Sequence, residues 1–194
     1  MNSQIKSFID DDGKSWNNIG AELLIFNGHQ LIYFTQNGDK DYLSIEESSF
    51  GAVSGRGNYG VFTYTEDEQA TNMTGPIPEG EYYIEPQGIQ YYDNLNTIQK
   101  IKSIFGLGTF PGGIQSWGKE RVWIMPSSIS ITNPTTGKKI TRSNLSIHGG
   151  GKAGSAGCID LYVNAPPFFS KLKNSSAKRI RLSVQYEKGI KVVL

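Results

Sequence analysis

Alternation of apolar and polar side chains along much of the chain predicts a protein built mainly from β-strands. Near the end, the segment RIRLSVQY has apolar residues at every second position, namely Ile180, Leu182, Val184 and Tyr186. A period of two places these side chains on one face of a strand, so we expect a half-buried strand there. Earlier, LLIFNGHQLIYF contains two apolar runs joined at Asn27-Gly28, a dipeptide typical of tight hairpin turns. We therefore predict a β-hairpin in this segment.

Further strands are predicted between turn signals. Segment 81–85 follows GPIPEG, whose proline and glycine residues indicate a turn before a short strand. The segments RVWIMP and SISITNPTTGKKITRSNLSIHG are also strand-like, with a turn near residues 134–137. The segment DYLSIEESSFGAVSGRGNYG continues the β pattern and ends in a glycine-rich loop.

Two segments predict helices. In DNLNTIQKIKSIFG the apolar residues recur every three or four positions, at Leu95, Ile98, Ile101 and Phe105. Asp93 or Asn94 is suited to cap the start of this helix, and Gly106 to end it. A second, shorter helix is expected from near Asn164, because Pro166 would lie in its first turn, where proline is favoured.

These elements predict a mainly β fold of the α+β class, a curved sheet or sandwich with one or two helices packed on it. A chain of 194 residues is long enough to bury a substantial core as a single domain. We assign residues 16–194 to that domain and residues 1–15 to a loose N-terminal extension.

Composition narrows the possible partners. The chain has 19 basic and 18 acidic residues, a net charge of +1, which gives no reason to expect binding to nucleic acid or to an anionic membrane surface. No apolar run approaches the roughly 20 residues of a membrane span. The start lacks the basic and apolar regions of a secretory signal, so we expect either a cytoplasmic protein or export that needs no cleaved signal.

The only cysteine, Cys158, lies ten positions after His148, one of two histidines. Nine residues separate them, five of which are glycine. The simplest interpretation is a flexible loop between a histidine at a strand end and a buried, inert cysteine. A single cysteine excludes an intrachain disulfide and a four-cysteine metal site.

Two ligand-binding interpretations of the glycine-rich segment are disfavoured. Gly149, Gly151 and Gly154 satisfy the G-x-G-x-x-G pattern, but the following SAGCIDLYV is strand-like, whereas a dinucleotide site needs a helix there. A zinc site would need three or four ligands, and only His148, Cys158 and Asp160 are near in sequence, without a paired ligand spacing. We therefore expect neither a cofactor nor a metal ion.

The remaining interpretation is nucleophilic catalysis. An ordinary thiol is only a few per cent ionised at pH 7, and a nearby imidazole raises that fraction and later protonates a leaving amine. Glycines without Cβ atoms let a peptide approach closely, and the backbone N–H groups of Gly157 and Cys158 are candidates for binding an oxyanion. Ser155, three positions before Cys158, is suited to hold the turn by a hydrogen bond. A papain-like or NlpC-like enzyme is disfavoured because it has cysteine before histidine.

The segment IHGGGKAGSAGCIDL resembles the active-site signature of the L,D-transpeptidases, whose catalytic domain is called YkuD-like. In that family a histidine precedes a Ser-x-Gly-Cys element whose cysteine attacks peptidoglycan stem peptides. The short interval from His148 to SAGCI at 155–159 is more similar to the L,D-transpeptidase-like effectors of type VI secretion systems. Upstream, LLIFNGHQLIYF, FGAVSG and GPIPEGEYYI resemble elements of the same effectors in the same order, so the resemblance covers roughly residues 20–165.

One position departs from the family pattern. Many housekeeping L,D-transpeptidases carry arginine directly after the Cys-Ile or Cys-Val pair, where it helps to hold the substrate carboxylate, and this chain has Asp160 there. Arg142, Lys152 or Arg56 are candidates to supply the missing positive charge. Together with Gly149 and Gly150, Arg142 and Lys152 are our candidate substrate-binding residues. No Asp or Asn is assignable as the partner that orients His148, so we expect a backbone carbonyl in that role.

The resemblance implies an antibacterial toxin that acts on peptidoglycan as a cysteine L,D-carboxypeptidase and L,D-transpeptidase, a hydrolase and transferase. Cys158 would be the nucleophile and His148 the acid–base, acting on stem tetrapeptides through a thioester. The protein would be made in the cytoplasm without a signal peptide, exported by type VI secretion machinery, and active in the periplasm of target bacteria, where a cognate immunity protein would block it. The alternative is a non-catalytic β module that binds cell-wall glycan or a secretion partner.

Overall fold

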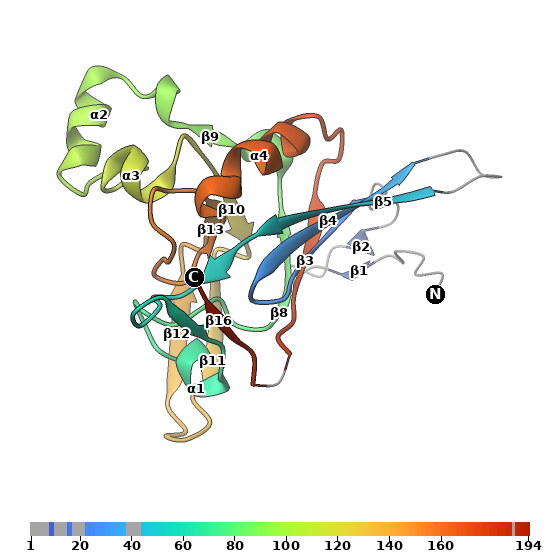
Figure 1. Cartoon of the computed structure of the whole chain (residues 1–194), viewed down its shortest axis with the longest axis vertical. Helices are drawn as coiled ribbons and strands as arrows, with labels where there is room; N and C mark the ends of the chain where they lie inside the picture. The colour runs from blue at the N-terminus through green and yellow to red at the C-terminus, as the bar shows by residue number, and fades with distance from the viewer. Residues whose placement is uncertain (1–7, 10–14, 17–21, 38–43, 188) are drawn as a thin grey trace.

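The computed structural model describes residues 8–9, 15–16, 22–37, 44–187 and 189–194 of the chain. Its main element is one long, curved sheet that runs through the molecule (Figure 1). In spatial order its strands are β5 (Ser44–Gly51), β4 (Gln30–Asn37), β3 (Glu22–Phe26), β15 (Ile180–Val184), β8 (Gly80–Ile84), β10 (Glu120–Met125), β13 (Ser146–His148), β14 (Ile159–Asp160) and β6 (Val53–Ser54). Strand β9 (Gln90–Tyr91) also pairs with β10.

Three short antiparallel pairs lie outside this sheet. They are β1 (Phe8–Ile9) with β2 (Ser15–Trp16), β7 (Val61–Thr63) with β16 (Lys191–Val193), and β11 (Ser128–Thr132) with β12 (Lys139–Ser143). The β11–β12 hairpin extends away from the sheet at the lower end of the view in Figure 1. Its second strand carries Arg142, which returns toward the sheet and is buried.

Helix α4 (Ala165–Lys173) covers the sheet and closes the core. Its Phe168 ring lies 6.2 Å from the ring of Tyr33 and 5.5 Å from that of Phe50, so the helix packs on β4 and β5. Phe169 and Leu172 on the same helix are fully buried in the core cluster, which also contains apolar side chains from β3, β8, β10, β13, β14 and β15. The other helices are α1 (Glu66–Gln69), α2 (Thr97–Ile104) and α3 (Gly113–Trp117).

The expected fold class is confirmed, because the protein is mainly β with a curved sheet and a few short helices. The predicted hairpin forms with Gly28 at φ +101°, and Asn27 Oδ1 accepts hydrogen bonds from the backbone N–H groups of His29 and Gln30. The strand predicted near the end is β15, and Pro166 lies in the first turn of α4 as expected.

Helix α2 differs in two respects from the prediction. It begins at Thr97 behind an Asn96 cap rather than behind Asp93 or Asn94, because residues 92–94 form a 3₁₀ turn. Its apolar residues Ile98 and Ile101 are largely exposed, so this helix stands beside α3 and does not pack on the core (Figure 1). The predicted extension, residues 1–15, lies largely outside the described residues. No helix in the described ranges is long and apolar enough to cross a membrane.

We expect Leu182→Ala to lower the free energy of unfolding by about 2–5 kcal/mol, because the side chain is fully buried in the core and its loss leaves a cavity. Ile45→Ala is the matched control, since Ile45 is 58% exposed and should change stability by less than about 0.5 kcal/mol. Urea denaturation of both variants checks this. Equal losses in the two variants would contradict the assigned core.

Candidate active site

A short parallel strand pair brings the two ends of the glycine-rich segment together. Strands β13 and β14 pair in register, Ile147 beside Ile159 and His148 beside Asp160. Ile147 and Ile159 are fully buried in the core. Since side chains alternate across a strand, the neighbours of these isoleucines project from the opposite face of the sheet.

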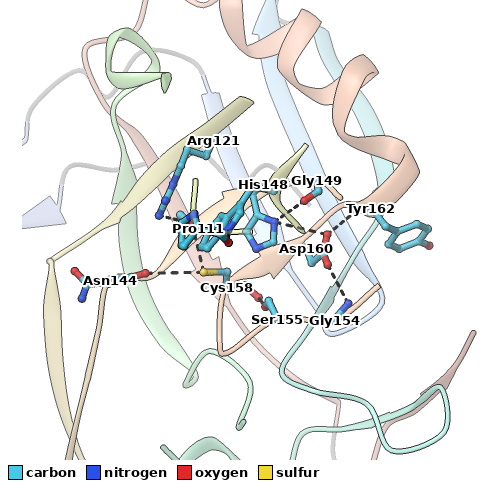
Figure 2. Close-up of polar contacts among 12 residues, drawn as sticks. Pro111, Arg121, Asn144, His148, Gly149, Gly154, Ser155, Cys158, Asp160 and Tyr162 are labelled. Atoms are coloured by element: carbon cyan, nitrogen blue, oxygen red, sulfur yellow. Dashed lines mark hydrogen bonds and ion pairs between the residues drawn. The ribbon is translucent and has the colours of Figure 1, made fainter. Parts of the chain in front are cut away.

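That opposite face carries the chemistry. His148, Asp160 and Cys158 project from it (Figure 2). Ser146 lies two positions before His148 and so projects from the same face. All four side chains are buried, with exposed fractions between 0 and 5%. The structure thus places the cysteine and the histidine, ten positions apart in the sequence, on the same face of the sheet, with a serine and a carboxylate beside them.

Strand β10 extends this polar face on the other side of β13. Arg121 pairs with His148 and Trp123 pairs with Ser146, whereas Val122 between them pairs with Ile147 in the core. The Arg121 guanidinium lies over the rings of Trp123 and Trp117, 3.8 and 4.1 Å from their centroids. A buried cation is therefore part of the site.

The Cys158 sulfur has polar neighbours although it is buried. Ser146 Oγ donates a hydrogen bond to Sγ at 3.3 Å, and the thiol donates to the Asn144 carbonyl at 3.9 Å (Figure 2). Burial raises the pKa of the Cys158 thiol above its ordinary value, while the hydrogen bonds from Ser146 and the charge of Arg121 oppose that rise. In this conformation the sulfur is therefore a neutral thiol at pH 7.

The two ring nitrogens of His148 have different surroundings. Its Nδ1 lies 2.7 Å from the Gly149 carbonyl oxygen and 3.9 Å from Asp160 Oδ1. Because a carbonyl only accepts, Nδ1 carries the hydrogen in the neutral ring and Nε2 keeps its lone pair. Nε2 is buried and has no hydrogen-bond partner among the described residues, so its lone pair is not engaged by any of them.

Burial sets the charge state of His148. It lowers the pKa of the imidazole to about 4, against a smaller opposing effect of the Gly149 carbonyl, so the ring is neutral at pH 7. The expected backbone carbonyl beside His148 is present as that of Gly149. Asp160, considered in the sequence as a zinc ligand and as a departure from the family pattern, is a second neighbour of the same nitrogen.

Asp160 is fully buried and fixed by backbone donors. Its two oxygens accept hydrogen bonds from the N–H groups of Gly154, at 2.9 Å, and Tyr162, at 2.8 Å. Burial raises the pKa of this carboxyl to about 7, although both hydrogen bonds oppose the rise. Asp160 on β14 thus holds Gly154, the residue directly before the Ser-x-Gly-Cys turn, by a hydrogen bond.

The turn before Cys158 is tightly held. The predicted hydrogen bond across it is present, because Ser155 Oγ donates to the Cys158 carbonyl at 2.7 Å. Gly157 adopts φ +109°, and a Cβ at this position would lie 2.1 Å from Arg142 Nη2. Both the left-handed conformation and the close contact require glycine here.

Arg142 lies beneath this turn. Its guanidinium donates to the carbonyls of Gln69, Gly75 and Pro76 at 2.6–3.0 Å, and the side chain is 2% exposed. These contacts favour a role in fixing the chain around residues 69–76 rather than direct contact with substrate. The other two candidate cations, Lys152 and Arg56, are exposed.

Helix α3 covers the site. The Trp117 ring lies 4.5 Å from the His148 ring, and its carbonyl accepts a hydrogen bond from the N–H of Gly149 at 3.2 Å. The Gln115 carbonyl accepts another from Gly151 at 2.8 Å, and a Cβ on Gly150 would lie 3.0 Å from the Ser116 carbonyl. Gly150 and Gly151 thus allow close packing of α3 on the loop.

Sequence reasoning missed Arg121, Ser146 and Asn144. For two of them a signal was present, because the period of two in a strand puts Arg121 on the face opposite Val122 and Ser146 on the face opposite Ile147. A buried arginine on a core strand is uncommon unless polar or charged groups contact it. Only the order of the strands shows which groups lie beside Arg121. Within the described ranges, no group of three or more His, Cys, Asp or Glu residues is arranged to hold a metal ion.

Fold and site together define a class: a mainly β protein with a buried histidine on β13 and a buried cysteine directly before the parallel strand β14. A comparison with protein families shows that the Tlde1 domain matches residues 48–185, well over half of the chain. The chain therefore belongs to the Tlde1 domain family, the family of type VI secretion L,D-transpeptidase effectors, as the resemblance implied. A search of curated proteins found no match.

Family membership gives the general function. The chain is of a type VI secretion effector family, which implies contact with the secretion machinery and with an immunity partner. The family also indicates a peptidoglycan-modifying enzyme in general, and secretion with action in the periplasm.

The lowered pKa of His148 predicts a pH effect on stability. Between pH 6.5 and about 4 the unfolded chain binds a proton at this histidine and the folded chain does not, so acidification favours unfolding. Relative to His148→Gln, the wild-type chain should lose about 2 kcal/mol of unfolding free energy from pH 7.5 to pH 5.

Asp160 acts in the opposite direction in this range, because its raised pKa makes the folded chain bind the proton more tightly. That contribution is present in both proteins and cancels to first order in the comparison. Denaturant titrations at several pH values provide the measurement. Parallel stability curves for the two proteins would contradict a buried neutral His148.

Proposed function

We propose that this protein is a cysteine-dependent L,D-carboxypeptidase and L,D-transpeptidase that acts on peptidoglycan stem tetrapeptides through a thioester. The observation that carries the proposal is the parallel pairing of β13 and β14. On the same buried polar face, this pairing holds the Cys158 thiol and His148 Nε2, which has no hydrogen-bond partner within the described part of the chain. A thiol and a neutral imidazole with a free lone pair are the minimal parts of a thiol acyl-transfer site.

In the first step, Sγ attacks the carbonyl carbon of the link between the L centre of meso-diaminopimelate and the terminal D-Ala. His148 Nε2 takes the thiol proton and then gives it to the nitrogen of D-Ala as the C–N bond breaks. D-Ala leaves as a free amino acid, and the tripeptide remains bound to Cys158 as a thioester. The neutral state of His148 at pH 7 suits its role as the base.

In the second step, an acceptor attacks the thioester carbon and restores the thiol. Water gives carboxypeptidase activity, a free D-amino acid gives exchange, and the amine of another stem gives a cross-link. His148 removes the proton from the acceptor and returns it to sulfur. Trimming and exchange both remove tetrapeptide donors for later cross-linking, which accounts for toxicity in a competitor's periplasm and for the need for an immunity protein.

The surrounding groups support this chemistry. The Gly149 carbonyl fixes the tautomer of His148, and Asp160 at 3.9 Å stabilises the imidazolium that forms when the thiol loses its proton. We assign the oxyanion donors to the backbone N–H groups of Gly157 and Cys158. The Ser155 hydrogen bond to the Cys158 carbonyl and the Gly157 contact with Arg142 hold this turn in place.

A substrate can reach Cys158 only if α3, which covers the site, moves. Cys158 is 5% and His148 2% exposed, and the Trp117 ring lies against the imidazole. We propose that α3 separates from the loop 149–151 when the stem peptide enters, so that the peptide backbone replaces the bonds made by the carbonyls of Gln115 and Trp117. Only a few backbone hydrogen bonds would be exchanged.

We expect Cys158→Ala and His148→Ala to remain folded and to lose D-Ala release from purified muropeptide tetrapeptides by about a thousandfold or more, because each removes a reacting group. Mass spectrometry of the products, with and without added D-amino acid, measures trimming and exchange separately. Ile45→Ala, on an exposed site of β5, should retain full activity. Full activity of Cys158→Ala would end the catalytic assignment.

A second candidate function is a non-catalytic β module that binds cell-wall glycan or a secretion partner. The observation in its favour is the burial of Cys158 and the raised pKa of its thiol, both of which suit an inert structural cysteine. The two candidates differ in how the thiol becomes accessible. A structural cysteine reacts only when the whole chain unfolds, whereas a catalytic one reacts through local opening of its cover.

The destabilised Leu182→Ala variant separates these candidates, because Leu182 lies on β15, four places from β14 in the sheet order. If opening is local, iodoacetamide should alkylate Cys158 at the same rate in Leu182→Ala and in the wild-type chain. A loss of about 2 kcal/mol would raise a rate limited by global unfolding about thirtyfold. Such an increase would favour the non-catalytic module.

A further inference from the structure

Arg121 is a buried cation without a carboxylate partner among the described residues. Its side chain is 2% exposed, and the guanidinium lies over the rings of Trp117 and Trp123. Two of its nitrogens donate hydrogen bonds, to the Thr109 carbonyl and to Ser146 Oγ, and Nε has no partner among these residues. Burying a charge without a counter-ion is costly, so an anion close to Arg121 would be strongly stabilised.

Ser146 connects this cation to the sulfur. Arg121 Nη2 lies 3.3 Å from Ser146 Oγ, and Ser146 Oγ lies 3.3 Å from Cys158 Sγ. Arginine only donates, so the hydroxyl oxygen must accept from Arg121. The single hydrogen of the hydroxyl is then directed at the sulfur. The geometry thus fixes a donor on Sγ, whichever charge the sulfur carries.

A fixed donor of this kind favours the thiolate over the thiol. Hydrogen bonds to an ionised acceptor are roughly twice as strong as those to a neutral one. Ionisation of Cys158 also provides the counter-charge that Arg121 lacks. Other charged or titratable groups near the sulfur are His148 on β13, Asp160 on β14 and Arg142 on β12, and of these only Asp160 opposes ionisation of the thiol by its charge.

We propose that Arg121 and Ser146 are positioning residues that favour the thiolate of Cys158 through the chain of contacts from guanidinium to hydroxyl to sulfur. Arg121 on β10 supplies a positive charge close to the cysteine, and Ser146 on the neighbouring strand β13 connects the two. In this chain the position after Cys158-Ile159 is Asp160 and not arginine. The inference rests on the catalytic function proposed above, in which the thiolate is the attacking species.

The rate of alkylation of the single cysteine tests this in the intact chain. At pH 8, Ser146→Ala should react with iodoacetamide about tenfold more slowly than the wild-type chain, because loss of a hydrogen bond to a charged acceptor shifts the thiol by about one pKa unit. The pH profile of the rate should move to higher pH by the same amount. Ser146→Thr, which keeps the hydroxyl, should restore the wild-type rate.

A merely structural role for Ser146 predicts the opposite sign, because loosening of the site exposes the sulfur and speeds alkylation. Ser54→Ala is the matched control: Ser54 is also a buried serine, and its hydroxyl donates to the Gly157 carbonyl but not to sulfur. This variant should react at the wild-type rate or faster. An alkylation rate of Ser146→Ala equal to or above that of the wild-type chain would overturn the proposal.

Arg121→Gln should slow alkylation as Ser146→Ala does. The double variant should be slowed by less than the product of the two single effects, because part of the effect of Arg121 passes through Ser146. If Arg121→Gln does not fold, Arg121→Lys replaces it, with an expected rate between those of Ser146→Ala and the wild-type chain. Additive effects in the double variant would show that Arg121 and Ser146 act independently, which would contradict the proposed chain of contacts. None of these assays uses peptidoglycan, so a wild-type chain that releases no D-Ala would refute the function and leave the thiolate effect measurable.

Discussion

The site depends on the register of one short parallel strand pair. Strands β13 and β14 are only three and two residues long, yet their pairing decides which side chains share a face. A shift by one residue would turn Cys158 toward the core and Ile159 toward the polar face. The buried isoleucines therefore do more than stabilise the sheet, because their burial fixes the orientation of the reactive groups beside them.

Burial shifts the pKa values of the titratable groups on the polar face toward their uncharged forms. Burial raises the pKa of Cys158, lowers that of His148 to about 4 and raises that of Asp160 to about 7, so each group tends toward its uncharged form. Arg121 is the exception, since its pKa falls only to about 10 and it stays charged at pH 7. Arg121 is thus a permanent cation beside groups that burial shifts toward their uncharged forms, and in the proposed mechanism it favours negative charge on sulfur.

Much of the architecture followed from local patterns. Period-two alternation predicted β15, Asn27-Gly28 predicted the hairpin, and proline near Asn164 predicted the start of α4, because each signal acts within a few residues. The packing of α2 against the rest of the protein was not predictable from such local signals. Its period of three to four residues defines an apolar face, but the sequence does not say what covers that face, and in the structure Ile98 and Ile101 are exposed.

The sequence by itself pointed to Cys158 and His148 as the candidate reactive pair, because the segment that contains them resembles the active-site signature of the L,D-transpeptidases. It also determined the turn, since Ser155 bonds locally to the Cys158 carbonyl. Only the tertiary structure decided the environment of the sulfur. Arg121 and Ser146 reach it from β10 and β13, and Arg142, although it lies against the turn before Cys158, donates to carbonyls of residues 69–76. Contacts between distant segments set electrostatics and burial, and no local pattern encodes them.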